Sequence, residues 1–451
     1  MRIYLVSPTH YDANGALHKT TRYWTSGITL PYLKAITPQG HDVRLVDELM
    51  HDVDLDHECD VVGITAMGPQ IVRAYDLARE FRARGRRVVL GGTWATLTAE
   101  ESLRHADAVV AGEAEDVWPE VLADFSEGRT KGIYRARGGW RSLAGLAPID
   151  YETLPLLKLQ AFRESALYRM YFHWPVIFSR GCPHPCEYCA VQTYYQRSYR
   201  TRPADDVLED LRRIKALGGN RILFLDDNPI AHPNDAKELF RKMIPFGMKW
   251  ASQSTINMAR DPELLDLAAR SGCVSLSIGL ESINQESLRG IKKDFNQARR
   301  FREDIAALRA KGIQVIALIM VGLDGDTPDT FGRTLQFLLD SKVSFLKLFT
   351  PCPYPGTKFY DDLARDGRIL DGNWARYDYG SPLIKPTGMT SDEMMDGFKY
   401  VYEGFYSITN ILRRFTPPPK GQLLESLAYV VANLKVNRYL RSHERAWATI
   451  S

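Results

Sequence analysis

Three of the chain's six cysteines lie within one short stretch, "RGCPHPCEYC" at residues 180–189. Cys182, Cys186 and Cys189 have the spacing C-x3-C-x2-C, so their thiolates can converge on one metal centre. Structural zinc is one candidate, with His184 or a distant residue as the fourth ligand. A four-iron cluster is the other, and it usually takes four cysteines, so three would leave one iron open. The spacing and the two prolines that flank His184 favour the cluster.

The second half of the chain contains the elements that would position this loop. Apolar runs at 175–181, 221–228, 248–255, 274–282, 313–323 and 343–351 alternate with helical patterns such as 203–219 and 261–272. Six strands, each followed by a crossover, predict a partial (β/α)6 barrel of the TIM type over 171–365. The cysteine loop directly follows the first strand. It is therefore expected at the carboxyl ends of the strands, where such barrels have their active sites.

The first 127 residues show a similar alternation of strand and helix patterns. Strands are expected at 2–8, 42–48, 60–67, 86–92 and 106–115, with helices at 30–40 and 69–85. This rhythm predicts a Rossmann-like, doubly wound parallel sheet, and its ligand should bind outside the carboxyl ends of the strands. The overall fold class is therefore α/β.

Two further regions complete the expected organisation. Residues 128–170 are irregular and are expected to form a linker, and 366–451 form a C-terminal helical region. Thr390 and Glu393 are spaced as a capping box before a helix that runs to 415. A proline-rich break follows at 416–422. The last helix, 423–443, is expected to pack its apolar stripe on the barrel and not on a membrane.

The chain resembles the radical S-adenosylmethionine (SAM) superfamily, in which a C-x3-C-x2-C loop follows the first barrel strand. Three later motifs match in order: "FLDDN" at 224–228, "SIGLES" at 277–282 and "MVGLDGDT" at 320–327. The resemblance implies a 4Fe-4S cluster on the three cysteines, with the open iron holding the amino and carboxylate groups of S-adenosylmethionine. The residues implied to contact this cofactor are Tyr188, Asp226, Asp227, Ser277, Glu281 and Gly322. Reductive cleavage would give a 5'-deoxyadenosyl radical, which requires a closed site.

The N-terminal domain resembles the cobalamin-binding domain of one branch of this superfamily, many of whose members methylate unactivated carbon. The matching stretches lie at 30–48, 60–78, 88–103 and 107–122. The implied pocket residues are Ser7, Thr65, Gly91, Gly92, Trp94, Gly112 and Glu113. The chain departs from other cobalamin proteins by lacking a D-x-H-x-x-G signature. Trp94 stands where relatives often carry histidine, and it can either pack on the corrin or fill its pocket.

These features predict a radical SAM enzyme, with cobalamin-dependent methylation of a small metabolite or lipid as the first reaction. The alternative is a cobalamin-free or non-methylating reaction, such as ring contraction, cyclisation or dehydrogenation. Cys352 follows the last barrel strand, where it either donates hydrogen to a product radical or packs under the "PYPGT" turn. A reductant such as flavodoxin or ferredoxin is implied.

Other function classes are disfavoured by composition. A net charge of +3 on 451 residues does not indicate a nucleic-acid partner. Transfer-RNA modification is a weak alternative, because the related methylthiolating enzymes carry three more cysteines in the N-terminal domain, where this chain has only Cys59. The start of the chain resembles a strand and not a signal peptide, and the longest apolar run is too short for a transmembrane helix. We therefore expect a cytosolic protein.

Overall fold

The computed structural model describes residues 1–12, 14–20, 25–136, 139–415 and 423–442. The predicted break at 416–422, residues 137–138 of the predicted linker and residue 443 of the predicted last helix lie outside this range. The chain divides into two compact units. The first contains Met1–Val176, Thr193–Leu223 and Asn373–Ala375, and the second contains Ile177–Gln192, Phe224–Gly372 and Arg376–Ser451.

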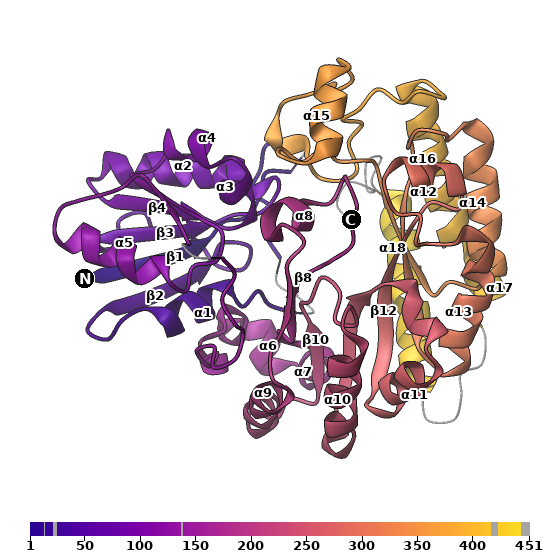
Figure 1. Cartoon of the computed structure of the whole chain (residues 1–451), viewed down its shortest axis with the longest axis horizontal. Helices are drawn as coiled ribbons and strands as arrows, with labels where there is room; N and C mark the ends of the chain where they lie inside the picture. Colours follow the sequence, from indigo (N-terminus) through magenta and orange to yellow (C-terminus); the bar gives the residue numbers. More distant parts are fainter. Residues whose placement is uncertain (13, 21–24, 137–138, 416–422, 443–451) are drawn as a thin grey trace. The chain divides into compact units, whose positions relative to one another are not determined.

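A six-stranded sheet with the order β2-β1-β3-β4-β5-β6 forms the centre of the first unit, and its strand pairs are parallel. Helices cover both faces, as the Rossmann-like prediction required (Figure 1). The strands are β1 (Arg2–Ser7), β2 (Asp42–Asp47), β3 (Val61–Thr65), β4 (Arg87–Gly91), β5 (Ala108–Ala111) and β6 (Ile133–Arg135). The helices between them are α1 (Thr29–Ile36), α2 (Gln70–Ala83), α3 (Thr93–Leu97), α4 (Ala99–Leu103) and α5 (Val117–Ser126).

Successive side chains along the buried strands point to opposite faces of the sheet, and apolar side chains on both faces explain why helices pack on each. On one face, Tyr4 of β1 meets Phe81 of α2 edge-on at 6.1 Å between ring centroids. On the other face, α5 inserts Trp118 against β3 at Gly63, where a Cβ atom would come within 2.8 Å of Leu5. The glycine thus allows the tryptophan of α5 to pack directly on the strand.

Residues 128–170 contain more regular structure than the predicted linker. β6 adds a sixth strand to the sheet, because Val109 to Ala111 pair with Ile133 to Arg135. Short helices follow, namely η1 (Tyr151–Thr153), η2 (Pro155–Lys158), α6 (Gln160–Glu164) and α7 (Ala166–Tyr171). The three-residue strand has too little pattern to be recognised from sequence. The domain boundaries expected from the sequence stay predictions.

The second sheet has the order β14-β13-β12-β11-β10-β7, and the pairs from β11 to β14 are parallel. This confirms the prediction of a second, six-stranded parallel sheet. Its strands are β7 (Trp174–Val176), β10 (Arg221–Phe224), β11 (Lys249–Ser254), β12 (Cys273–Glu281), β13 (Gln314–Met320) and β14 (Phe345–Phe349). The expected first strand at 175–181 is broken into β7 and β8 (Ser179–Gly181), and β8 pairs with β9 (Tyr199–Thr201) in a separate two-stranded sheet.

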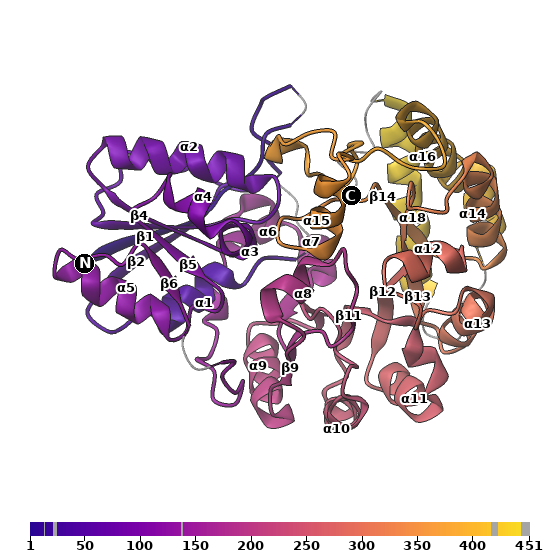
Figure 2. The same cartoon turned by 45° about the horizontal axis from the view of Figure 1, so that its top comes forward.

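The remaining elements follow the expected alternation (Figure 2). The helices are α8 (Ala190–Tyr195), α9 (Ala204–Ala216), α10 (Pro233–Met243), α11 (Pro262–Arg270), α12 (Gln285–Gly290), α13 (Phe301–Ala310), α14 (Pro328–Asp340), α15 (Lys358–Arg365), α16 (Ser391–Tyr406), α17 (Ile408–Arg414) and α18 (Leu423–Ser442). Single 3-10 turns are η3 (Ile244–Phe246), η4 (Ile256–Arg260), η5 (Ala298–Arg300) and η6 (Trp374–Arg376).

The C-terminal helices differ from the prediction at one point. The capping box of Thr390 and Glu393 is present at the start of α16. The predicted helix to 415 is instead divided at Ser407, whose backbone is extended and whose side chain caps α17 through the amide of Asn410. Serine competes for backbone hydrogen bonds and therefore favours such a helix start.

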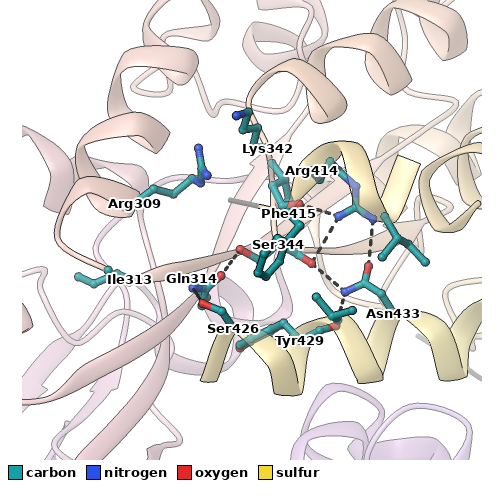
Figure 3. Close-up of a pocket in the computed structure, with 14 residues that line it drawn as sticks. Arg309, Ile313, Gln314, Lys342, Ser344, Arg414, Phe415, Ser426, Tyr429 and Asn433 are labelled. Atoms are coloured by element: carbon teal, nitrogen blue, oxygen red, sulfur yellow. Dashed lines mark hydrogen bonds between the residues drawn. The ribbon is translucent and has the colours of Figure 1, made fainter. Parts of the chain in front are cut away.

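Within the second unit, helix α18 contacts α17 and the start of β14 through a polar face (Figure 3). Asn433 is 3% exposed; its amide donates to Ser344 O at 3.0 Å, and its side-chain oxygen accepts from Arg414 at 3.0 Å. Leu427, Val431 and Leu434 are exposed. The apolar stripe therefore does not supply the packing surface that the sequence predicted. None of the helices in the described part of the chain is long and apolar enough to span a membrane.

Candidate active site

The start of the cysteine loop is held by two adjacent carboxylates that follow β10. Asp226 is 2% exposed and accepts from Phe178 N at 3.1 Å and from both the amide and the hydroxyl of Ser179. Asp227 accepts from Gly181 N at 3.2 Å. Burial raises the pKa of Asp226 to about 7 and that of Asp227 to about 6. Both carboxylates therefore act on the backbone of β8, and their contact with the amino group of a cofactor stays a prediction.

The three cysteines of the loop are thiols of low accessibility. Burial raises the pKa of Cys186 to about 11 and that of Cys189 to about 12, and it also raises the pKa of Cys182. Mutual repulsion of the thiolates adds to the shift of Cys186 and Cys189. A bound cation would remove this penalty, because metal binding releases the thiol protons. Asn228 Nδ2 lies 4.0 Å from Cys182 Sγ.

The spacing of these thiols bears on the zinc alternative. Within the described ranges, no three His, Cys, Asp or Glu side chains converge as the ligands of a single metal ion would. In a four-iron cluster each cysteine binds a different iron, so its ligands are spaced more widely than those of zinc. His184 instead stacks on Phe295, with ring centroids 4.0 Å apart. His184 is therefore not arranged as the fourth ligand of a zinc ion in the described part of the chain.

Tyr188, Glu281 and Lys293 form a buried triangle beside the second and third cysteines. Glu281 Oε1 accepts from Lys293 Nζ at 2.6 Å and from the Tyr188 hydroxyl at 2.9 Å, and Lys293 Nζ lies 3.1 Å from that hydroxyl. Glu281 has φ +64°, a left-handed conformation that is costly for a non-glycine residue. It follows a register shift between β12 and β13. The strand end is thus bent to direct this carboxylate at the cysteine loop.

The segment that contains Lys293 makes two further contacts that secure the loop. Glu187 N donates to Ile291 O at 3.2 Å, and Phe295 stacks on His184 as described above. Asn296 is fully buried and donates to Gly279 O at 2.9 Å, which attaches the segment to β12. Sequence reasoning missed this segment, because nothing in its residue types separates the buried Lys293 from its exposed neighbour Lys292.

The other residues predicted to contact S-adenosylmethionine lie at the same edge of the second sheet. Ser277 is partly buried on β12, on the strand face that also carries Gly279. Gly322 follows β13 with φ +91°, and its amide donates to Asp326 Oδ2 at 3.1 Å. Asp326 is 1% exposed and also accepts from Ser287 at 3.0 Å. It therefore shapes the glycine loop, and it is a residue that sequence reasoning did not select.

An aromatic cluster follows β14 in the second unit. Cys352 is 6% exposed and lies within hydrogen-bond reach of the Tyr354 hydroxyl, which also contacts the hydroxyl of Tyr379. Tyr379 is 38% exposed, has φ +64° and packs 5.5 Å from Phe349. Phe349 and Tyr188 pack against the same small apolar cluster. This places aromatic surface, and a buried thiol, near the cysteine loop.

In the first unit, the predicted pocket residues gather at the carboxyl edge of the sheet, because β1, β3, β4 and β5 are neighbours. These residues are Ser7, Thr65, Gly91, Gly92 and Gly112, all partly buried. A Cβ atom at Gly112 would meet nothing within 4 Å, whereas one at Gly92 would strike Ala66. Met67, just after β3, is 64% exposed. The edge thus combines open space, close backbone approach and an exposed apolar side chain, which suits a large apolar ligand.

Trp94 and Glu113 differ from the other pocket residues. Trp94 is fully buried and meets Trp374 edge-on at 5.1 Å, and Trp374 Nε1 donates to Glu101 at 2.8 Å. Glu113 forms a two-fold ion pair with Arg200, at 2.8 and 3.0 Å. The indole is therefore enclosed against Trp374, which lies far along the chain from this domain, and the Glu113 carboxylate has a partner in the protein.

A cavity of about 100 Å³ lies far along the strands from the cysteine loop (Figure 3). It is lined by residues at the amino ends of β13 and β14, such as Gln314 and Ser344, and by Arg414 and α18. Active sites of parallel barrels lie at the carboxyl ends. This cavity is therefore not the candidate site.

Comparison with known proteins identifies both units. The model of the radical SAM superfamily matches residues 176–338, and that of the B12 binding domain matches 20–122. The chain contains a radical SAM domain and a B12-binding domain. Its radical SAM domain contains the cysteine loop, the buried triangle and the glycine loop.

Two relatives and one solved structure resemble the whole enzyme. The chain is 28% identical to bacteriochlorophyllide d C-12(1)-methyltransferase of Chlorobaculum tepidum, over 92% of this chain and 88% of the relative. It is 25% identical to the anaerobic magnesium-protoporphyrin IX monomethyl ester cyclase of Cereibacter sphaeroides, over 90% of this chain and 70% of the relative. The structure of TsrM from Kitasatospora setae, with cobalamin and a [4Fe-4S] cluster bound, has a TM-score of 0.65 at 16% identity, covering 96% and 91% of the two chains. The likeness to the TsrM structure supports the fold of this chain and, at 16% identity, nothing further.

The family implies three cofactors, a small-molecule substrate and a reductant. The residues present fit the cluster, because three thiols lie on one braced loop and the positive charge of Lys293 favours the thiolate form of each. They also fit the B12-binding domain, since the carboxyl edge carries small residues and the exposed Met67. Trp94 is fully buried, and its two possible roles, packing on the corrin or filling its pocket, stay predictions.

Proposed function

We propose that the enzyme is a cobalamin-dependent C-methyltransferase acting on an unactivated carbon of a ring-bearing metabolite or lipid. The observation that carries this proposal is the presence, in one chain, of a cysteine loop braced for a cluster and a B12-binding domain with an open carboxyl edge. The relative of similar length whose name states a reaction on a bacteriochlorophyllide supports it. When bound, the cluster and cobalamin supply the electron and the methyl group for such chemistry.

The chain's own residues have three tasks in this reaction. Cys182, Cys186 and Cys189 would hold the cluster, with Tyr188 and Glu281 fixing the loop between them. The glycine loop at Gly322, shaped by Asp326, would lie along the cofactor. Tyr354, Tyr379 and Phe349 would pack on the substrate rings and exclude water from the reacting carbon.

The measurement is product analysis with anaerobically reconstituted protein. Bacteriochlorophyllide d and a magnesium-protoporphyrin monomethyl ester, the compounds named for the two relatives, would be incubated with S-adenosylmethionine and flavodoxin as reductant. Formation of S-adenosylhomocysteine together with 5'-deoxyadenosine is the expected result, and Cys186→Ala should give neither. Deoxyadenosine without S-adenosylhomocysteine or methylated product would contradict methyl transfer.

We also propose a cytosolic location.

A non-methylating reaction is the second candidate, because the cyclase relative covers 90% of this chain. Such a reaction can end with hydrogen donation to a product radical, and Cys352 with Tyr354 offers the group for it. Cys352→Ala distinguishes the two candidates. It should preserve methyl transfer, but it should abolish the product of a reaction that takes its hydrogen from the thiol.

A further inference from the structure

Lys347 lies in the middle of β14 on a face that the proposed chemistry has not used. Burial alternates along Phe345–Phe349, and Leu346 and Leu348 are 0% exposed. Lys347 therefore shares the opposite face with Phe349, which packs against the apolar cluster that also contacts Tyr188. This is the face toward the cysteine loop, inside the barrel.

The register of the sheet sets the height of Lys347 in the barrel. Lys347 pairs with Leu318 of β13, and Leu318 pairs with Gly279 of β12. Gly279 is the position where an added Cβ atom would collide with Glu281 and Lys293. Two strand spacings amount to about 10 Å. Lys347 is therefore level with the buried triangle and two strands away from it.

The side chain of Lys347 has no counter-charge in the described part of the chain. It makes no hydrogen bond and no ion pair there, and burial alone lowers its pKa. Other enclosed cations of this unit are neutralised or capped: Lys293 by Glu281, and Arg260 by Asp304 at 2.8 Å. Ammonium groups are rarely enclosed without a partner, because losing their hydration costs several kcal/mol. Lys347 itself is partly buried, between Leu346 and Leu348 at 0% exposure. Its ammonium thus loses part of its hydration without gaining a partner in the described part of the chain.

We propose that Lys347 is a binding residue for a carboxylate carried by a ligand in the barrel. The proposal rests on the proposed function, since it deepens the substrate class of that site. Two sources offer the same group: the methionyl carboxylate of S-adenosylmethionine, and an acidic side chain of the substrate, such as the propionate of a tetrapyrrole. A carboxylate would satisfy the ammonium by a charge-assisted hydrogen bond.

Binding measurements on the anaerobically reconstituted protein separate the two sources and need no turnover. One arm compares S-adenosylmethionine with decarboxylated S-adenosylmethionine by equilibrium dialysis. The other compares bacteriochlorophyllide d with its propionate methyl ester by quenching of protein fluorescence. The variant is Lys347→Met, and Lys249→Met, at the amino end of β11, is the matched control.

In one of the two arms, Lys347→Met should lower the affinity for the carboxylate-bearing ligand by roughly tenfold to a hundredfold. This is the contribution of a hydrogen bond to a charged group. The ligand that lacks the carboxylate should bind wild type and variant equally. Lys347→Arg should retain part of the affinity, and Lys249→Met all of it. The melting temperature of Lys347→Met should rise, because a partly buried charge without a partner is removed, and this shows that weaker binding is not unfolding. Equal binding of both acids to wild type and Lys347→Met would overturn the proposal, as would a fall in melting temperature.

Discussion

Lys293 Nζ lies 2.6 Å from Glu281 Oε1, the same oxygen that accepts from the hydroxyl of Tyr188 at 2.9 Å. Because Tyr188 stands between Cys186 and Cys189, this one carboxylate links a lysine twelve residues downstream to the metal-binding loop. The pair is enclosed, with side chains 10% and 9% exposed. Removing one partner of such a pair leaves an uncompensated charge.

Lys293→Met should therefore disorder the cysteine loop and lower the iron and sulfide content after reconstitution severalfold. The control is Lys292→Met, one residue away and exposed, which should load iron as wild type does. Lys293→Arg should recover part of the content. Iron, sulfide and the electron paramagnetic resonance signal of the reduced cluster provide the measurement. Equal cluster content in Lys293→Met and Lys292→Met would show that the triangle does not position the loop.

Asp326 should make stability depend on pH. Burial raises its pKa to about 6, from an unfolded value near 4. A carboxyl with a raised folded-state pKa binds its proton more tightly in the folded chain, so its contribution to stability is lost as pH rises from 4 to 6. A pKa difference of about two between the folded and the unfolded chain corresponds to about 3 kcal/mol of stability. Asp326→Asn keeps an acceptor for Gly322 N and removes the titration. Between pH 4.5 and pH 7, the free energy of unfolding measured in urea should fall less for Asp326→Asn than for wild type. An equal fall in both proteins would contradict the assignment.

Glu113 and Arg200 should behave as a coupled pair. Glu113→Gln leaves the guanidinium, 14% exposed, without its carboxylate, and should lower the free energy of unfolding by about 3 kcal/mol. Arg200→Met in the same chain should restore part of the loss. The double-mutant cycle is measured by urea unfolding of the cluster-free protein. If the effects simply add, the pair is not coupled.

Substitutions of Trp94 and Met67 should distinguish a residue that stabilises the B12-binding domain from one that contacts its ligand. Trp94→Ala empties an enclosed site and should cost about 3 to 5 kcal/mol of stability. Met67→Ala changes an exposed side chain and should alter stability by less than about 0.5 kcal/mol, yet weaken cobalamin binding. Thermal unfolding and corrin absorbance after gel filtration report the two quantities. Normal stability with loss of corrin in Trp94→Ala would place the indole in the ligand pocket.

The sequence predicted the parts of the site that are local in the chain. Cysteine spacing and strand periodicity located the loop and the two sheets, since these depend on neighbouring residues. Lys293 was missed because only burial distinguishes it from Lys292. The contact of Trp374 with Glu101 spans 273 residues and has no local pattern. Sequence reasoning assigned "FLKLF" to a strand but did not select Lys347, because its lack of a partner depends on every surrounding element.

The two aspartates after β10 have a thermodynamic consequence for metal uptake. They hold the amides of Phe178, Ser179 and Gly181, while the triangle around Glu281 holds Tyr188 at the far end of the same loop. Ordering a free segment of this length would cost on the order of 1 kcal/mol per residue. Here most of that entropy is already lost when the chain folds. Iron uptake can then proceed on a prepared loop, unlike in a zinc finger, whose folding must be driven by its metal.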